Sequence, residues 1–228
     1  MEFIGIATEQ TTAVTDLVLA LVSFIALLEM RLFIKTDRWK SWLWILIFGL
    51  LTAAAVLGTI VHGFKMSPSL NLFLWHPLNL ALGLMVTFFI VAVVYEIWGD
   101  MIARKVLPLM IIVEACFFVV TVTWPDQFII FIVYEALATI FALSGFLWLA
   151  ITRKPAGAWF MVSGIFLTIV AAGIQASGPF RLTLIWEFDH NGVFHIIQIA
   201  AVYILVWGLR TSLTFHQPPT EESDAVIP

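Results

Sequence analysis

Seven long runs of apolar residues, separated by short polar connections, cover most of the chain. They span residues 11–34, 40–64, 72–98, 102–124, 127–151, 157–177 and 191–213. A helix that crosses a bilayer core about 30 Å thick needs roughly 20 apolar residues. None of the runs alternates apolar and polar residues with a period of two, as the strands of a membrane barrel do. The pattern therefore predicts an all-α fold, a bundle of seven transmembrane helices.

The composition supports an integral membrane protein. Of the 228 residues, 62% are hydrophobic and 11% are charged, and the mean hydropathy is +1.04. Soluble domains contain roughly 45–50% apolar and roughly 25% charged residues. The net charge of -4 and the scattered basic residues argue against a nucleic acid partner. We expect a multi-pass protein of a plasma or inner membrane, with membrane lipids as its surroundings.

The chain is predicted to form one transmembrane domain, residues 1–215, followed by a disordered cytoplasmic tail, residues 216–228. The connections between the runs are short and no internal repeat is present, so a second domain is not expected. The tail is rich in proline and acidic residues, a composition typical of disorder. Cys116 is the single cysteine, which excludes a disulfide framework.

The distribution of basic residues predicts the orientation of the bundle. Lysines and arginines concentrate in the connections after the first, third and fifth runs and after the seventh. On the opposite side only Lys65 and Arg181 are found. By the positive-inside rule, the N-terminus is outside and the C-terminus is cytoplasmic. Glu29 and Glu96 lie close to the basic connections, and we expect both to form interfacial ion pairs.

Polar residues within the apolar runs concentrate near the predicted outer ends of the helices. Ionisable groups at membrane depth are costly and therefore indicate a functional site. These residues are Asp16, His62, His76, Asn79 and Gln175, and at the start of the seventh run Asp189, His190, Asn191, His195 and Gln198. Glu114 and Glu135 lie roughly 12–15 Å below the outer boundary, at 1.5 Å of rise per residue. We expect one polar chamber that opens outward, above a closed apolar half.

Simpler explanations exist for each of these residues taken alone. His62 and His76 also fit interfacial rings beside a short loop. Asp16 also fits a hydrogen bond within its own helix, and Glu114 and Glu135 fit protonated structural residues equally well. None of these explanations accounts for the concentration of polar groups on one side of the bundle.

The residue types in the predicted chamber are those of a zinc site. Imidazole and carboxylate groups bind zinc, and a site with an open position activates a water molecule. Candidate metal ligands are His62, His76, His190, Asn191 and His195. Candidate catalytic acids, which would transfer the proton, are Asp16, Glu114 and Glu135. Asn79, Gln175, Asp189 and Gln198 are candidates for contact with a substrate or with these groups.

Helical geometry separates the two histidines of the seventh run. Asn191, His195 and Gln198 share one face at positions i, i+4 and i+7. If both were helical, His190 would point about 140° away from His195. His190 reaches the same site only if it precedes the helix, with Asp189 as the N-cap. His195 is therefore the better candidate for an inward ligand.

The chain resembles the CREST superfamily of membrane hydrolases in three features. These are seven spans with the N-terminus outside, His62 at the outer end of the second span, and the Asn191-x-x-x-His195 pattern. That superfamily includes the alkaline ceramidases and the adiponectin-receptor group. The resemblance implies a zinc ion held by three histidines, and the hydrolysis of a lipid amide. Two of the three zinc-binding histidines of that superfamily correspond to His62 and His195. Asn191 stands at the remaining histidine position unless His190 substitutes for it.

Two other positions depart from the pattern of that superfamily. Gly58, with Thr59 beside it, stands where the superfamily has a serine. The region of its aspartate is occupied by His76 or Asn79. These departures leave open whether a metal is bound in the same way.

Three functions are compatible with this pattern. The first is a zinc-dependent hydrolase acting on a lipid amide or ester, or on another amphiphilic small molecule, from the outer leaflet. The second is a transporter or receptor in which Asp16, Glu114, Glu135 and the histidines bind a solute or a proton. The third is a b-type haem protein with two histidine ligands; the location of the histidines near one face excludes two stacked haems. The interior of the spans contains no lysine for a Schiff base, which excludes a retinal protein.

Overall fold

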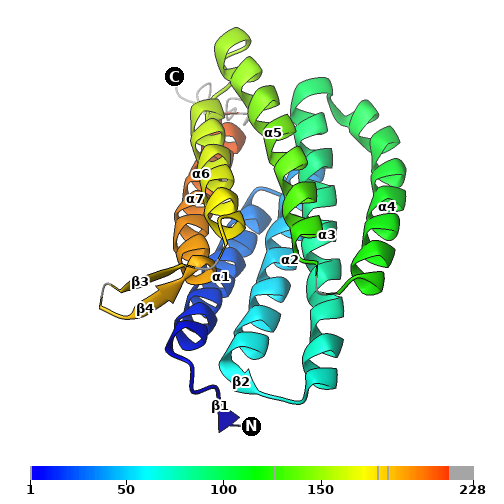
Figure 1. Cartoon of the computed structure of the whole chain (residues 1–228). Coiled ribbons are helices and arrows are strands. Elements are labelled where there is room, and N and C mark those ends of the chain that lie inside the picture. Colours follow the sequence, from blue (N-terminus) through cyan, green and yellow to red (C-terminus); the bar gives the residue numbers. More distant parts are fainter. Residues whose placement is uncertain (1, 126, 179, 184, 216–228) are drawn as a thin grey trace, which may run out of the picture.

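Seven α-helices form the protein in the computed structural model, which describes residues 2–125, 127–178, 180–183 and 185–215 (Figure 1). They are α1 (Ala7–Leu32), α2 (Arg38–Gly63), α3 (Pro68–Trp98), α4 (Asp100–Thr123), α5 (Ile129–Thr152), α6 (Ala158–Ala176) and α7 (His190–Thr214). Each helix is long and apolar enough to cross a membrane. The protein is an integral multi-pass membrane protein, and the seven predicted spans are confirmed to within about one helical turn. The predicted tail lies outside the described residues, and the orientation stays a prediction.

Two small antiparallel sheets accompany the helices. β1 (Glu2–Phe3) pairs with β2 (Phe64–Lys65), and β3 (Arg181–Thr183) pairs with β4 (Glu187–Asp189). The apolar pattern did not predict them, because strands of two or three residues leave no periodic signal. Both sheets lie toward the end of the bundle where α1, α3, α5 and α7 begin (Figure 1). We call this end the N-terminal end.

Six of the helices form a closed ring. α1 packs against α2 and α7, α3 packs against α2 and α5, and α6 packs against α5 and α7. α4 lies at the edge of the molecule and packs mainly against α3 (Figure 1). The ring encloses a space in which polar side chains are separated from lipid.

The half of the ring away from the N-terminal end is filled by apolar side chains, and we call it the closed half. Trp44 is 1% exposed and contacts Phe48 and Phe89 through its ring. At this end Glu96 pairs with Lys40, and Glu29 pairs with Arg210. Both glutamates thus form ion pairs with basic residues, as predicted.

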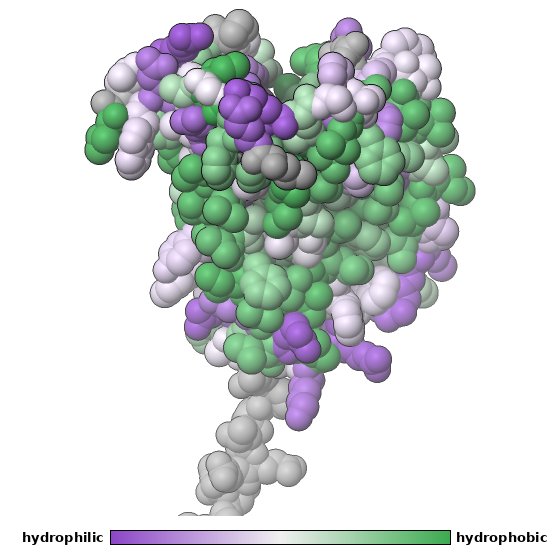
Figure 2. All heavy atoms as spheres, turned by 90° about the horizontal axis from the view of Figure 1, so that it is seen from below, coloured by the Kyte–Doolittle hydropathy of each residue, from purple (hydrophilic) through white to green (hydrophobic). Residues whose placement is uncertain are grey.

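The outer surface of the bundle is apolar. Large hydrophobic side chains are exposed along the spans, among them Leu21 on α1, Leu109 on α4 and Tyr203 on α7. Seen from the N-terminal end, hydrophobic residues occupy most of the visible surface and hydrophilic residues gather in patches at its edges (Figure 2). An exposed apolar surface of this extent is suited to contact with acyl chains.

Candidate functional site

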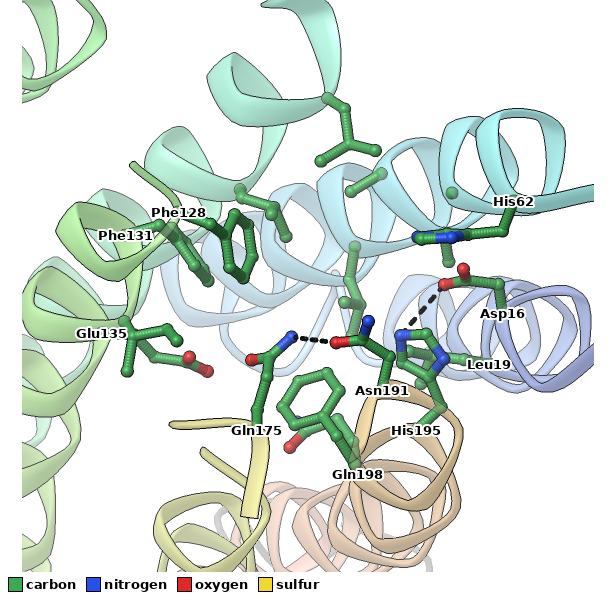
Figure 3. A pocket seen from close by; sticks show the side chains of 18 of the residues that line it. Asp16, Leu19, His62, Phe128, Phe131, Glu135, Gln175, Asn191, His195 and Gln198 are labelled. Atoms are coloured by element: carbon green, nitrogen blue, oxygen red, sulfur yellow. Dashed lines mark hydrogen bonds and ion pairs between the residues drawn. The ribbon is translucent and has the colours of Figure 1, made fainter. Parts of the chain in front are cut away.

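A cavity of about 380 Å³, which we call the polar pocket, lies inside the ring toward the N-terminal end (Figure 3). Its walls differ in character. The polar lining residues come from α1, α2, α5, α6 and α7: Asp16, His62, Glu135, Gln175, His190, Asn191, His195 and Gln198. Most of the apolar lining comes from α3 and the start of α5: Trp75, Leu78, Leu82, Met85, Phe128, Phe131 and Ile132. The pocket is therefore amphipathic.

Asp16 lies beside histidines from two other helices. Nε2 of His195 is 3.3 Å from Oδ1 of Asp16. The ring of His62 lies on the other side of the Asp16 carboxylate (Figure 3). Asp16 and His195 are 4% and 8% exposed, respectively. This cluster joins α1, α2 and α7, and three of the predicted site residues meet in it.

Gly58 allows the Asp16 carboxylate to reach this position. A Cβ atom at residue 58 would lie 2.5 Å from Oδ2 of Asp16, a distance that no real contact allows. Gly58 is one helical turn before His62 on α2. The missing side chain thus places the carboxylate directly against the helix that carries His62.

Hydrogen bonds on the Nδ1 atoms orient both histidines. The Thr15 hydroxyl donates to the Thr12 carbonyl at 2.9 Å, so toward His195 Nδ1, 3.1 Å away, it acts as an acceptor. With the hydroxyl in this orientation, the proton of a neutral His195 ring is on Nδ1. Nδ1 of His62 is 2.7 Å from Oε2 of Glu9 and donates to that carboxylate. In their neutral forms both rings then present Nε2 as an acceptor.

The contact between His195 and Asp16 therefore joins two acceptors. A neutral imidazole with a protonated Nδ1 has a lone pair on Nε2, and an ionised carboxylate has only lone pairs. The 3.3 Å contact between them becomes attractive when the pair shares an additional proton or another cationic group.

The opposite end of the polar pocket contains acceptors without partners. Gln175 donates from Nε2 to Oδ1 of Asn191 at 3.3 Å. Within the described part of the chain, Oε1 of Gln175, Oε1 of Gln198 and Oε2 of Glu135 are buried without a hydrogen-bond partner. The carboxylate of Glu135 and the amide of Gln175 point toward one another (Figure 3).

The start of α7 follows the predicted capping. Asp189 is the N-cap, and its Oδ1 accepts hydrogen bonds from the Gly192 backbone at 2.8 Å and from the Thr12 hydroxyl at 2.9 Å. His190 is the first residue of the helix, and both His190 and His195 line the polar pocket. We expected the angle between the two side chains to exclude one of them from the site. Instead, they lie on different parts of the same lining.

Four predicted site residues do not line the polar pocket: Glu114, Asn79, His76 and Asp189, which is the N-cap of α7. Glu114 is 2% exposed and packs against α3, where a Cβ atom at Gly83 would collide with its carboxylate. Asn79 is buried one turn before Gly83, and His76 is partly buried on the same helix. The roles predicted for these residues stay predictions.

Two residues that hold the histidines, Glu9 and Thr15, were not among the predicted site residues. Glu9 is seven residues before Asp16 and so lies on the same face of α1. Thr15 directly precedes Asp16 in the sequence. The helical spacing on α1 could have identified Glu9, whereas the Thr15 contact depends on the position of α7.

No metal site is formed by the described residues as they stand: among them, no group of three histidine, cysteine, aspartate or glutamate side chains could hold a metal ion. The donor types that zinc prefers are present in His62, Asp16 and His195. However, Asp16 contacts His195 directly. The predicted zinc ion stays a prediction.

Comparison with known proteins gives a family and no function. No curated protein and no solved structure matches the chain. The resemblance to the CREST superfamily therefore stays a prediction. The model of a "Family of unknown function (DUF6962)" matches residues 11–214, a range that covers nearly all of the seven helices. The chain belongs to the DUF6962 family.

Proposed function

We propose that this protein binds a small amphiphile in the polar pocket and acts as a membrane receptor or carrier. The observation that supports the proposal is the division of the pocket into a polar wall and an apolar wall. Ligand sites are mostly apolar cavities with a few placed polar groups that orient the ligand. Here most of the polar groups lie on α1, α6 and α7, with His62 on α2 and Glu135 on α5, whereas the lining residues of α3 are all hydrophobic.

A surface cleft of about 930 Å³ offers a route to the polar pocket. Trp75 and Phe128 line both cavities, and their rings meet edge to face with centroids 6.0 Å apart. The ring of His62 contacts Trp75 at the same centroid distance. Rotation of the Trp75 and Phe128 side chains would connect the two cavities. Under the predicted orientation, the route begins at the outer side of the membrane.

A substitution that fills the polar pocket tests the proposal. Leu82 lies on the apolar wall, so Leu82→Trp places an indole in the cavity. Leu109→Trp is the matched control, because Leu109 is 59% exposed on α4, away from the pocket. Thermal unfolding in nanodiscs is measured with ten-carbon amphiphiles that carry hydroxyl, ammonium or carboxylate heads.

We expect at least one amphiphile to raise the unfolding temperature of the wild type and of Leu109→Trp, because a ligand stabilises the state that binds it. The same amphiphile should leave Leu82→Trp unchanged. Equal responses of the two variants, or no response of the wild type to any of the three probes, would contradict the proposal.

A second proposal is metal-dependent hydrolysis of a lipid amide or ester at His62, Asp16 and His195. The observation in its favour is that the Nδ1 atoms of both histidines are held by Glu9 and Thr15, which leaves both Nε2 atoms for a ligand. Histidines that bind metals commonly donate their other ring nitrogen in this way. A bound zinc ion would supply an activated water molecule. The cluster would have to separate Asp16 from His195 to admit the ion.

Elemental analysis distinguishes the second proposal from the first. Stoichiometric zinc in the purified wild type, lost in His62→Ala and retained in His76→Ala, would support a metal site. His76 is the control because it does not line the polar pocket. Absence of metal from protein purified without chelator and reconstituted with zinc would refute it, while amphiphile binding would be unaffected.

A further inference from the structure

We infer that the polar head of the bound ligand is a primary ammonium group, held between Glu135 and Gln175. This inference rests on the proposed binding function and specifies its ligand. It is carried by the excess of acceptor atoms in the polar pocket, by the charges of its lining and by the aromatic rings beside Glu135.

The acceptors in the polar pocket have too few donors. Oε1 of Gln175, Oε1 of Gln198 and Oε2 of Glu135 are buried and unpaired within the described residues. The three side chains are at most 9% exposed. A buried polar atom without a partner is costly, so such atoms indicate a missing hydrogen-bond donor. A ligand that fits this end of the pocket therefore supplies N–H or O–H groups.

The charges in the pocket favour a cation over a neutral donor. Glu135 and Asp16 line the pocket, and the basic side chains of its described lining are three histidines, with no lysine or arginine. His62 and His195 lie beside Asp16, and no described basic residue forms an ion pair with Glu135. A carboxylate shielded from water requires a cation close by if it is to remain ionised. An ammonium group provides both the charge and three N–H donors, enough to reach Glu135 and Gln175 at once.

Aromatic rings complete the environment of the ammonium group. Phe128 and Phe131 line the same end of the pocket, next to Glu135 (Figure 3). Cations are attracted to the faces of aromatic rings, and more strongly where water is excluded. The apolar part of the ligand would lie along Leu82 and Met85 of α3. The ammonium group of an amine would thus contact Glu135, Gln175 and the two rings, while its apolar chain would contact α3.

Glu114 provides an internal comparison. It is 2% exposed and neither of its carboxyl oxygens has a partner among the described residues, as for Oε2 of Glu135. It packs against Gly83 and does not line the polar pocket. Because Glu114 does not line the polar pocket, its replacement should not change amine binding.

Binding of matched ten-carbon probes tests the inference in wild-type protein and in Glu135→Gln and Glu114→Gln, all in nanodiscs of zwitterionic lipid. The probes are decylamine, decanol and decyltrimethylammonium. Partitioning of each probe into lipid is the same for every variant, so the comparison between variants isolates the protein site. Thermal unfolding without probe first establishes that each variant is folded, and Gln175→Leu is a second variant that removes the amide acceptor.

We expect the wild type and Glu114→Gln to bind decylamine more tightly than decanol by about 30-fold or more, the loss typical of an unpaired buried charge. Glu135→Gln should reduce this preference to about threefold or less while decanol binding is retained. Decyltrimethylammonium lacks N–H donors, so it should bind less tightly than decylamine. Gln175→Leu should weaken decylamine binding more than decanol binding.

The outcomes separate failure of the inference from failure of the proposed function. Equal binding of decylamine and decanol, or an unchanged preference in Glu135→Gln, overturns the ammonium assignment and leaves amphiphile binding intact. An equal loss of the decylamine preference in Glu114→Gln and Glu135→Gln also overturns it, since the preference would then not depend on a carboxylate in the polar pocket. If no probe binds, the proposed function itself fails. Butylamine distinguishes a free amine from a membrane amphiphile, because it lacks the chain that the apolar wall would contact.

Discussion

The closed half and the half that contains the polar pocket are made from the same helices but differ in what surrounds their polar side chains. In the closed half, α2 contributes Trp44 and Phe48 to an apolar core, and Lys40 pairs with Glu96. Near the N-terminal end, the same helix contributes Gly58 and His62 to a cavity. Buried polar atoms without a partner occur in both halves, for example Nε1 of Trp44 in the closed half and Oε2 of Glu135 near the N-terminal end. The difference is that those near the N-terminal end lie beside a cavity that can hold a ligand. Substitutions in the closed half should therefore lower stability more than ligand binding. Substitutions beside the polar pocket should lower ligand binding more than stability.

The largest effect on the free energy of unfolding is expected when a tryptophan is replaced by alanine in each half. Trp44→Ala removes a fully buried ring from the closed half and should lower the free energy of unfolding by about 3–5 kcal/mol. Trp75→Ala should cost less, because its ring already borders two cavities. It should instead change amphiphile binding. Unfolding in mixed micelles with increasing SDS measures the difference, and a larger stability loss for Trp75→Ala would remove the distinction between the halves.

An intermediate effect is expected from two glycines of α2. Gly58→Ala forces the Asp16 carboxylate away from its position and should destabilise the protein by about 1–3 kcal/mol. Gly49→Ala meets a terminal methyl group of Leu27 at 3.2 Å, which can turn aside, so its cost should be smaller. The same unfolding assay compares the two variants. Equal costs would show that the contact between Gly58 and Asp16 does not fix the cluster.

The sequence predicted the helices well because long apolar runs identify membrane spans directly. It also predicted that Asp16, His62 and His195 meet, since depth along each helix follows from the rise per residue. Depth does not identify which neighbour a helix faces. Glu114 was therefore expected in the same chamber as Glu135, yet α4 lies outside the ring and turns Glu114 toward Gly83 of α3. The two sheets and the Thr15 contact depend on contacts distant in sequence and had no local signal.

The smallest effect is expected from an ion pair at the surface of the closed half. Arg210 is 3.3 Å from Glu29, and its side chain is 53% exposed. Exposed pairs contribute between about 0 and 1 kcal/mol, so Arg210→Gln should change the free energy of unfolding by no more than that. Its amphiphile binding should equal that of the wild type, because the pair is at the far end from the polar pocket. A decrease of several kcal/mol in the free energy of unfolding would mean that surface ion pairs, rather than the apolar core around Trp44, stabilise the closed half.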